Sequence, residues 1–386
     1  DMVSESFYDE IGNNEAQVKE WKRLYQLDKL KNGSFENTIG KSTLSSDFLK
    51  ANKKLVLDTA FFNNDFKFKL LQTFENLDES TDGLLIKSEN WQALNLLQAK
   101  YNGKIRCIYI DPPYNTGSDD FLYKDTYQHS SWLTMISDRL QLAHFLLEDQ
   151  GLIFVSIDDN ELSNLSLSMS KLFGPENPIA NFVIKSNPRG RQSDRFVATV
   201  HEYVLLGAKD YLSCSINGST LNTQQINEFK YKDKEGKPYR LLGLRQRGTA
   251  SRREDRPDMF FPIYVDPKNR KISLEKTEQF TVEVIPKKSD GSLGRWMWGK
   301  KKVQDEIENI EACLIARRNE FDIFVHDFLT KNGKQRTRKM KTIWDEKDLN
   351  YQNGKVELKN LFVTCPYAYP KPTSLIRHII PMAFAD

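Results

Sequence analysis

The feature that most constrains the fold is an alternation of strand-like and helix-like segments. Three β-rich apolar runs lie at residues 105–110, 152–157 and 200–206. Between them, at 131–147 and 158–173, apolar residues recur every three or four positions, as on one face of a helix. Strands that alternate with helices of these lengths are typical of βαβ units. The sequence therefore predicts an α/β fold with a mostly parallel sheet, covered by helices on both faces.

The regions outside this alternation differ in character. Residues 1–80 are polar, with one helix-like stretch at 15–30, and predict an accessory helical region. A short apolar run at 83–87 predicts an additional buried strand before a helix that is capped by Ser88, and residues 373–380 predict a last helix. The predicted regions are therefore residues 1–80, 81–212, 213–345 and 346–386, of which the third is an inserted module and the fourth returns to the sheet domain.

Charge is distributed unevenly along the chain. Residues 81–212 carry 12 basic and 16 acidic side chains, whereas residues 213–341 carry 28 basic and 18 acidic ones. A basic region beside an acidic one favours a polyanionic partner, although a solvated lysine-rich surface is the alternative. Apolar runs stay below the roughly 18 residues that a membrane span requires, and the four cysteines form no close pair. We therefore expect a cytoplasmic protein without a membrane segment, structural metal or disulfide.

One turn carries the chemistry. Asp111-Pro112-Pro113-Tyr114 follows directly on the strand predicted at 105–110, and ligands bind at the carboxyl ends of strands in open α/β sheets. The two prolines stiffen the turn and remove two N–H donors, so the Pro112 carbonyl can accept a hydrogen bond beside the Asp111 carboxylate. Tyr114 adds an aromatic face. Two acceptors and a stacking surface suit a flat ring with an exocyclic amino group, such as a nucleobase. The alternative is an ordinary structural turn.

The residues around this turn resemble the β-class amino-methyltransferases of DNA, especially the modification (Mod) subunits of type III restriction–modification systems. The similar stretch covers residues 105–161, and further segments follow in order at 201–206 (HEYVLL), 294–298 (GRWMW) and 369–376 (YPKPTSLI). The last of these is similar to the family's KP..LI segment. The resemblance spans residues 83–386 and implies a Rossmann-like methyltransferase sheet that uses S-adenosylmethionine as its cofactor.

The resemblance also implies a reaction. The family transfers a methyl group to an amino group of a base that is flipped out of duplex DNA. Asp111 and the Pro112 carbonyl would accept hydrogen bonds from the N6 amino group of adenine, Pro113 would stiffen the turn, and Tyr114 would stack on the base. Asp111 favours adenine, because related cytosine enzymes often have Ser in that position. In-line transfer requires no metal.

The resemblance assigns Lys371, Pro372 and Leu375 to the cofactor site. Asp158 follows a predicted strand, where an acidic residue can contact the cofactor or can simply stabilise a helix N-terminus. His129 precedes a predicted helix, and it either lines the pocket or caps that helix.

The basic region at 213–345 occupies the place where this family inserts its target-recognition domain. Arginine and lysine neutralise phosphates, and arginine can also pair with guanine in the major groove. The resemblance therefore implies that this region binds double-stranded DNA, and it further implies a restriction (Res) subunit as a partner and a homodimer. The candidate DNA-contacting residues are Arg245, Arg247, Arg252, Arg253, Lys334, Arg336 and Arg338.

One element of the family is absent from these 386 residues. The family's Phe-x-Gly-x-Gly loop, which approaches the cofactor, would follow the KP..LI segment, and no such sequence follows it here. We therefore expect a sheet that is incomplete at its C-terminal end and weak binding of S-adenosylmethionine by this chain alone. The alternatives are a catalytically incomplete DNA-recognition fragment or subunit and, with less support, a methyltransferase of RNA or of a protein glutamine.

Overall fold

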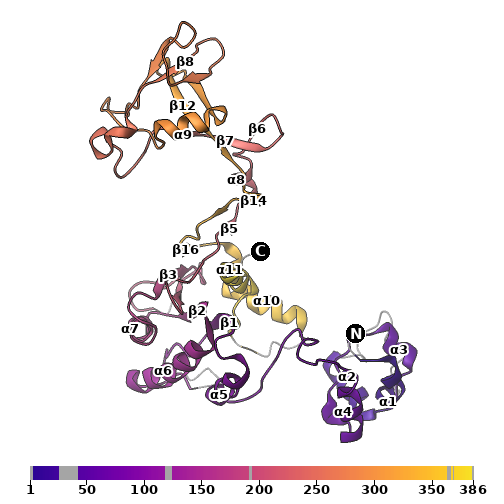
Figure 1. Cartoon of the computed structure of the whole chain (residues 1–386). Coiled ribbons are helices and arrows are strands. Elements are labelled where there is room, and N and C mark those ends of the chain that lie inside the picture. Colours follow the sequence, from indigo (N-terminus) through magenta and orange to yellow (C-terminus); the bar gives the residue numbers. More distant parts are fainter. Residues whose placement is uncertain are drawn as a thin grey trace. The chain divides into compact units, whose positions relative to one another are not determined.

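The computed structural model describes residues 3–25, 42–117, 124–190, 194–362, 367 and 369–384. The chain divides into two compact units, Asp1–Ser88 and Glu89–Asp386 (Figure 1). No helix among the described residues has the length and apolar character needed to cross a bilayer.

The first unit is helical. Val18, Trp21 and Phe66 are each 1% exposed and form the centre of its apolar core. The indole N–H of Trp21 donates to the Val56 carbonyl, at 2.5 Å, so the buried ring is also satisfied as a hydrogen-bond donor. Its elements are η1 (Glu5–Phe7), α1 (Tyr8–Gly12), α2 (Glu15–Tyr25), α3 (Ser46–Ala51), η4 (Thr59–Phe61) and α4 (Asn64–Leu71). The predicted helix at 15–30 is confirmed as α2 up to Tyr25, and its last five residues lie outside the described part.

The buried strand predicted at 83–87 is wrong. This segment has no strand in the structure, and the side chain of Leu85 is 99% exposed. It lies next to the boundary between the two units, where no neighbouring strand pairs with it, and an apolar run becomes a strand only when it is paired. The helix that follows, α5 (Asn90–Tyr101), is capped by Glu89 and not by Ser88: the Glu89 carboxylate accepts from the Gln92 N–H at 3.1 Å.

The second unit contains a five-stranded sheet in the order β1-β2-β4-β3-β16. Two neighbouring pairs, β1–β2 and β3–β16, are parallel, and two, β2–β4 and β3–β4, are antiparallel. The α/β class is confirmed, but the expectation of a mostly parallel sheet needs correction, because half of the pairings are antiparallel. No helix of the described residues separates β3 from β4, and a parallel pair would require such a crossover. The strands are β1 (Ile105–Ile110), β2 (Leu147–Ile157), β3 (Pro178–Ile184), β4 (Glu202–Ala208) and β16 (Ile343–Trp344).

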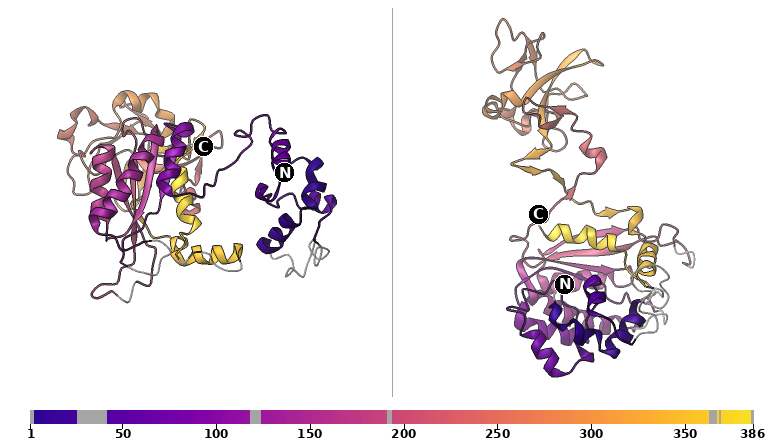
Figure 2. Two further views of the ribbon diagram at one scale, coloured as in Figure 1. Left: turned by 90° about the horizontal axis from the view of Figure 1, so that it is seen from below. Right: turned by 90° about the vertical axis from the view of Figure 1, so that its right-hand side faces the viewer.

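Helices cover both faces of this sheet (Figure 2). Along β2, Phe154 packs in one apolar cluster with α11, and its neighbour Val155 packs in the other cluster with α6 and α7. This alternation is the period of two that a strand imposes on its side chains. The covering helices are α6 (His129–Leu146), α7 (Leu162–Phe173) and α11 (Thr373–Ala383), with η8 (Lys347–Leu349) and α10 (Tyr351–Leu361) preceding α11 in the chain. Helix α7 ends as predicted at Gly174, whose φ of 100° suits glycine.

The insert between β4 and β16 has its own core, with Trp296, Ile323 and Leu244 fully buried. It contains a four-stranded sheet, a three-stranded sheet, the hairpin β13–β14 and the ribbon β5–β15. Its strands are β5 (Ser219–Thr220), β6 (Tyr231–Lys232), β7 (Pro238–Gly243), β8 (Ile263–Val265), β9 (Ile272–Ser273), β10 (Val282–Val284), β11 (Ile310–Ile315), β12 (Glu320–Phe328), β13 (Thr330–Lys331), β14 (Lys334–Gln335) and β15 (Thr337–Arg338). Its short helices are α8 (Thr223–Ile226), η5 (Arg253–Asp255), η6 (Pro257–Met259), α9 (Lys300–Asp305) and η7 (Ile307–Asn309).

Candidate active site

The strand directions bring three acidic segments to one edge of the sheet. Because β1 and β2 are parallel, with Ile110 opposite Val155, both end at this edge, and each is followed by an acidic residue, Asp111 or Asp158. Strand β4 is antiparallel to β2 and begins here, at Glu202. The carboxyl edge of parallel strands is where α/β proteins bind their ligands.

Lys371 completes a polar cluster at this edge. Its ammonium lies 2.6 Å from Glu202 Oε2, 2.6 Å from the Tyr114 hydroxyl and 3.6 Å from Asp111 Oδ1. The Tyr114 hydroxyl in turn donates to Glu202 Oε2 at 3.0 Å. We call these four side chains the edge cluster. It joins the ends of two strands to the residue that precedes Pro372, the N-cap of α11.

The edge cluster shifts the pKa of each of three members upward. The Asp111 side chain is 35% exposed, but the protein around its carboxyl group reduces hydration, and this desolvation raises the pKa of Asp111. The positive charge of Lys371 lowers the same pKa, and Glu202 raises it further. Burial and the two carboxylates hold the Tyr114 pKa well above its ordinary value. For Lys371, burial lowers the pKa, but Glu202 and Asp111 outweigh it and the pKa is raised. At neutral pH the cluster therefore holds an ammonium and a neutral phenol.

Trp132 supports the proline turn through a hydrogen bond. This side chain is fully buried in α6, and its indole N–H donates to the Pro113 carbonyl at 2.8 Å. No hydrogen bond within the described chain uses the preceding carbonyl, that of Pro112. The Pro112 carbonyl thus remains available to a ligand, and its pairing with the Asp111 carboxylate as two acceptors stays a prediction.

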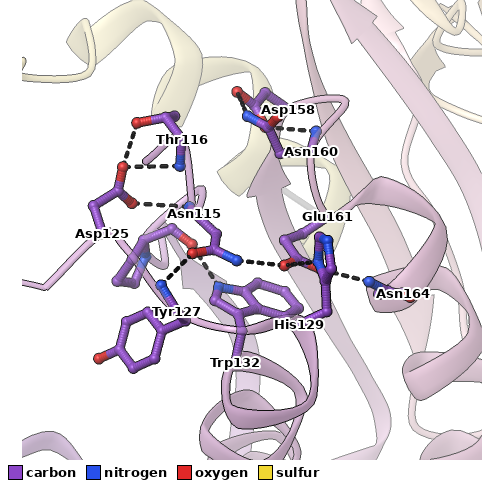
Figure 3. Close-up of polar contacts among 11 residues, drawn as sticks. Asn115, Thr116, Asp125, Tyr127, His129, Trp132, Asp158, Asn160, Glu161 and Asn164 are labelled. Atoms are coloured by element: carbon purple, nitrogen blue, oxygen red, sulfur yellow. Dashed lines mark hydrogen bonds and ion pairs between the residues drawn. The ribbon is translucent and has the colours of Figure 1, made fainter. Parts of the chain in front are cut away.

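The segment after the turn is held by a buried carboxylate (Figure 3). Asn115 has a positive φ of 58°, which its short polar side chain tolerates. Its backbone N–H donates to Asp125 Oδ1 at 2.8 Å, and the N–H of Thr116 donates to the other carboxylate oxygen at 2.9 Å. Asp125 is 2% exposed. The side chain of Asn115 also accepts from the Tyr127 N–H at 2.6 Å. Asp125 and Tyr127 therefore both hold the residues that directly follow the proline turn.

A second buried carboxylate, Glu161, ties this segment to α6 and α7 (Figure 3). Its Oε1 accepts from the Asn115 amide and contacts His129 Nδ1, each at 2.7 Å, and its Oε2 accepts from the Asn164 amide at 2.7 Å. Glu161 is fully buried, whereas the His129 side chain is 70% exposed. His129 is therefore the first residue of α6 and a partner of Glu161, while the N-cap of the helix is Gln128.

The predicted cofactor residues differ in their burial and in their contacts. Lys371 is held by Glu202, and Leu375 is 1% exposed within the core beneath the sheet. Pro372 is buried at the N-terminus of α11. Asp158 lies at the end of β2, where its carboxylate accepts from the backbone and side chain of Asn160, each at 3.0 Å. The roles of Lys371, Pro372, Leu375 and Asp158 toward S-adenosylmethionine therefore stay predictions.

The predicted DNA-contacting residues fall into two groups on separate elements. Arg245 and Arg252 bridge to Trp296 and Gly294, so their backbones lie beside one segment of the insert. In that group Arg247, Arg252 and Arg253 are exposed, and the Arg253 guanidinium lies 4.4 Å from the centre of the Phe260 ring.

The second group lies along β14 and β15. Lys334 is exposed, but Arg336 pairs with Asp327 at 2.5 Å and Arg338 Nε donates to Ser219 Oγ at 3.0 Å. Arg336, which lies between β14 and β15, and Arg338 in β15 therefore also attach this segment to neighbouring elements.

Sequence patterns did not identify Glu202 as a site residue. The detectable signal was an acidic side chain at the start of an otherwise apolar strand, in the segment 201–206. Asp125 and Glu161 were missed as well, because a buried carboxylate that supports a loop has no local sequence signature.

The fold and this site define an α/β protein whose sheet edge carries an acceptor pair beside an aromatic ring. Comparison with known families matches residues 105–385 to the model of a DNA methylase family, N6_N4_Mtase. The chain therefore belongs to this family of DNA methylases.

Individual relatives agree with this assignment. The chain is 29% identical over 336 residues to the EcoPI Mod subunit, a type III restriction–modification enzyme of Escherichia phage P1, covering 78% of this chain and 52% of that protein. It is 30% identical over 328 residues to the type II methyltransferase M.KpnI of Klebsiella pneumoniae, covering 82% and 75%. The chain thus spans about half the length of the EcoPI Mod subunit. Among solved structures, PvuII DNA methyltransferase (cytosine-N4-specific) matches at 14% identity, a TM-score of 0.24 and coverage of 36% and 59%.

Proposed function

We propose that this chain forms the target-base pocket and the DNA-recognition module of a methyltransferase that modifies the N6 amino group of adenine in duplex DNA. The observation that carries the proposal is the pair of acceptors, the Asp111 carboxylate and the unused Pro112 carbonyl, next to the Tyr114 ring. S-adenosylmethionine, when bound, supplies a methyl group activated by a sulfonium.

The residues of the chain would recognise and orient the amine. An exocyclic amino group has two N–H donors, and Asp111 and the Pro112 carbonyl provide one acceptor for each. Holding both N–H groups in these bonds orients the nitrogen lone pair, and positioning of this kind can account for much of the rate of a two-reactant step. Because these groups must surround the base, it has to leave the duplex stack, which supports base flipping.

The insert supports binding of DNA. It carries the positive charge of the chain, and Arg247, Arg252 and Lys334 are exposed where phosphates can reach them. Similarity to Mod subunits supports action within a restriction–modification system, together with a Res subunit. We also propose a homodimer, which rests on the family resemblance, and a cytoplasmic location, which rests on the spacing of the four cysteines.

The test is transfer of labelled methyl groups from S-adenosylmethionine to unmethylated duplex DNA. Asp111→Ala should abolish transfer, while DNA binding in a gel-shift assay stays within about twofold of wild type, because one acceptor is lost far from the phosphate contacts. Asp149→Ala is the matched control, since Asp149 is an exposed acidic residue near the start of β2, whereas the candidate site lies at the carboxyl end of that strand. Wild-type transfer by Asp111→Ala would refute the role of this carboxylate. Salt-sensitive DNA binding without any transfer would identify the chain as a recognition module alone.

A further inference from the structure

The ion pair of Glu202 and Lys371 lies inside the proposed base pocket. Lys371 is separated from Tyr114 by 257 positions in the sequence, yet its ammonium is within 2.6 Å of the Tyr114 hydroxyl. The side chains of Lys371 and Glu202 are only 18% and 13% exposed. An ion pair this close to the acceptor pair must influence which charges and hydrogen bonds a target base meets.

The distances show which carboxylate holds the ammonium. Lys371 Nζ is 2.6 Å from Glu202 Oε2, a charge-assisted hydrogen bond, and 3.6 Å from Asp111 Oδ1, which is beyond hydrogen-bond length. Two carboxylates compete for one ammonium, and Glu202 has the shorter contact. The Asp111 carboxylate therefore keeps its capacity to accept a hydrogen bond from a substrate.

The same contacts fix the orientation of Tyr114. Its hydroxyl accepts from Lys371 and donates to Glu202, so both of its hydrogen-bonding directions are used in a closed three-membered arrangement. A ring held at its hydroxyl end offers a fixed surface for stacking. Glu202 takes the shorter contact with the Lys371 ammonium, so Asp111 is the carboxyl group of the cluster that is left to face a target amine. A negative charge favours the positive charge that develops on an amine nitrogen as it forms a fourth bond.

We propose that Glu202 and Lys371 are positioning residues for methyl transfer: Glu202 holds Lys371 on the Tyr114 hydroxyl, which fixes the ring and leaves Asp111 only the longer ion pair with Lys371, so that its carboxyl group can accept from the target amine. This inference rests on the function proposed above. It assigns a role to Glu202, and it places Lys371 in the base pocket in addition to the cofactor role that family resemblance implies.

The two residues have opposite effects on Asp111, which makes the proposal testable. The titratable groups that face Asp111 in the described residues are Lys371, Glu202, Tyr114 and Tyr109, and the pKa values of both tyrosines are raised, so the phenols stay neutral. Lys371 lowers the pKa of Asp111 and Glu202 raises it. Lys371→Met should therefore move the Asp111 titration to higher pH, and Glu202→Gln should move it to lower pH, each by about one pH unit.

The experiment measures this titration in two ways. The first is carbon NMR of the full chain with aspartate labelled at the carboxyl carbon, using Asp111→Asn for assignment; it needs no activity. The second is the pH dependence of methyl transfer, in which activity falls on the acid side as Asp111 becomes protonated. Relative to wild type, we expect the Asp111 titration and the acid limb of the activity profile to move to higher pH in Lys371→Met and to lower pH in Glu202→Gln. Displacement in the same direction, or none, would overturn the proposal, because loss of packing alone has no reason to follow the sign of the removed charge.

The double variant separates positioning from a general loss of structure. In Glu202→Gln, Lys371 is free to bind Asp111, and transfer should fall about tenfold or more. Adding Lys371→Met removes the competing ammonium but also the contact that fixes the Tyr114 ring, so the double variant should lose less activity than the product of the two single losses. A double variant whose loss equals the product of the two single losses would contradict the proposal, because the two residues would then act independently. If the wild-type chain shows no transfer, the proposed function fails for this chain, and the NMR titration still decides the positioning roles.

Discussion

Replacing Trp132 by phenylalanine probes the support of the proline turn. The Trp132 side chain is fully buried, and its indole N–H, 2.8 Å from the Pro113 carbonyl, is the donor that α6 gives to this turn. Phenylalanine retains most of the apolar ring but has no N–H. The carbonyl then loses its partner, at a cost of about 1–3 kcal/mol, and the smaller ring adds about 1 kcal/mol for unfilled volume. We expect the free energy of unfolding to fall by about 2–4 kcal/mol.

The assay combines urea unfolding with labelled methyl transfer at a temperature where the variant is folded. Transfer should fall about tenfold or more beyond any change in folded fraction, because the turn that carries Asp111 is released. Ile136→Val is the matched control: Ile136 is 1% exposed, lies one turn further along α6 and does not bind the proline turn. It should lose about 0.5–1.5 kcal/mol of stability with wild-type transfer. If Trp132→Phe and Ile136→Val have equal specific activities, the hydrogen bond does not position Asp111.

Two further predictions concern the neighbourhood of the edge cluster and the insert. Gly354→Ala would place a Cβ atom 2.5 Å from the Pro370 carbonyl oxygen and 3.0 Å from the Lys371 backbone. Methyl transfer should therefore fall, and the free energy of unfolding should drop by about 1–3 kcal/mol. If both stay at the wild-type value, the close contact of α10 with the Pro370–Lys371 backbone does not limit the residue at position 354. Lys331 and Lys334 pair across the exposed β13–β14 hairpin, and each change to Gln should lower the salt dependence of DNA binding by about one counterion. A salt slope identical to wild type in the double Gln variant would remove the hairpin from the DNA interface.

The basic residues show why composition does not identify an interface. Sequence grouped Arg336 with Lys334 as DNA contacts, and both lie near the same hairpin. The structure pairs Arg336 with Asp327, at the end of β12, and leaves Lys334 exposed. Whether a positive side chain is available to phosphate depends on the acidic groups that folding places beside it, and these are distant in sequence.

The sequence by itself determined the local elements and the chemistry of the turn. Strand β1, the end of α7 at Gly174 and the helix α11 follow from apolar periodicity and from the special backbone preferences of glycine and proline, which act over a few residues. The Asp-Pro-Pro-Tyr motif directly after a strand likewise predicts the acceptor pair, because its stiffness and its hydrogen-bonding groups are properties of those four residues.

Tertiary structure alone decided the direction of the strands and the surroundings of Asp111. Periodicity is the same in parallel and antiparallel strands, so the antiparallel insertion of β4 was not predictable from its residues, although it is what brings Glu202 to the site. Lys371 reaches Tyr114 only because α11 packs on the sheet. The charge balance around Asp111 is a sum over groups from three separate segments, and electrostatic interaction depends on their distance in space and on the water that folding excludes between them.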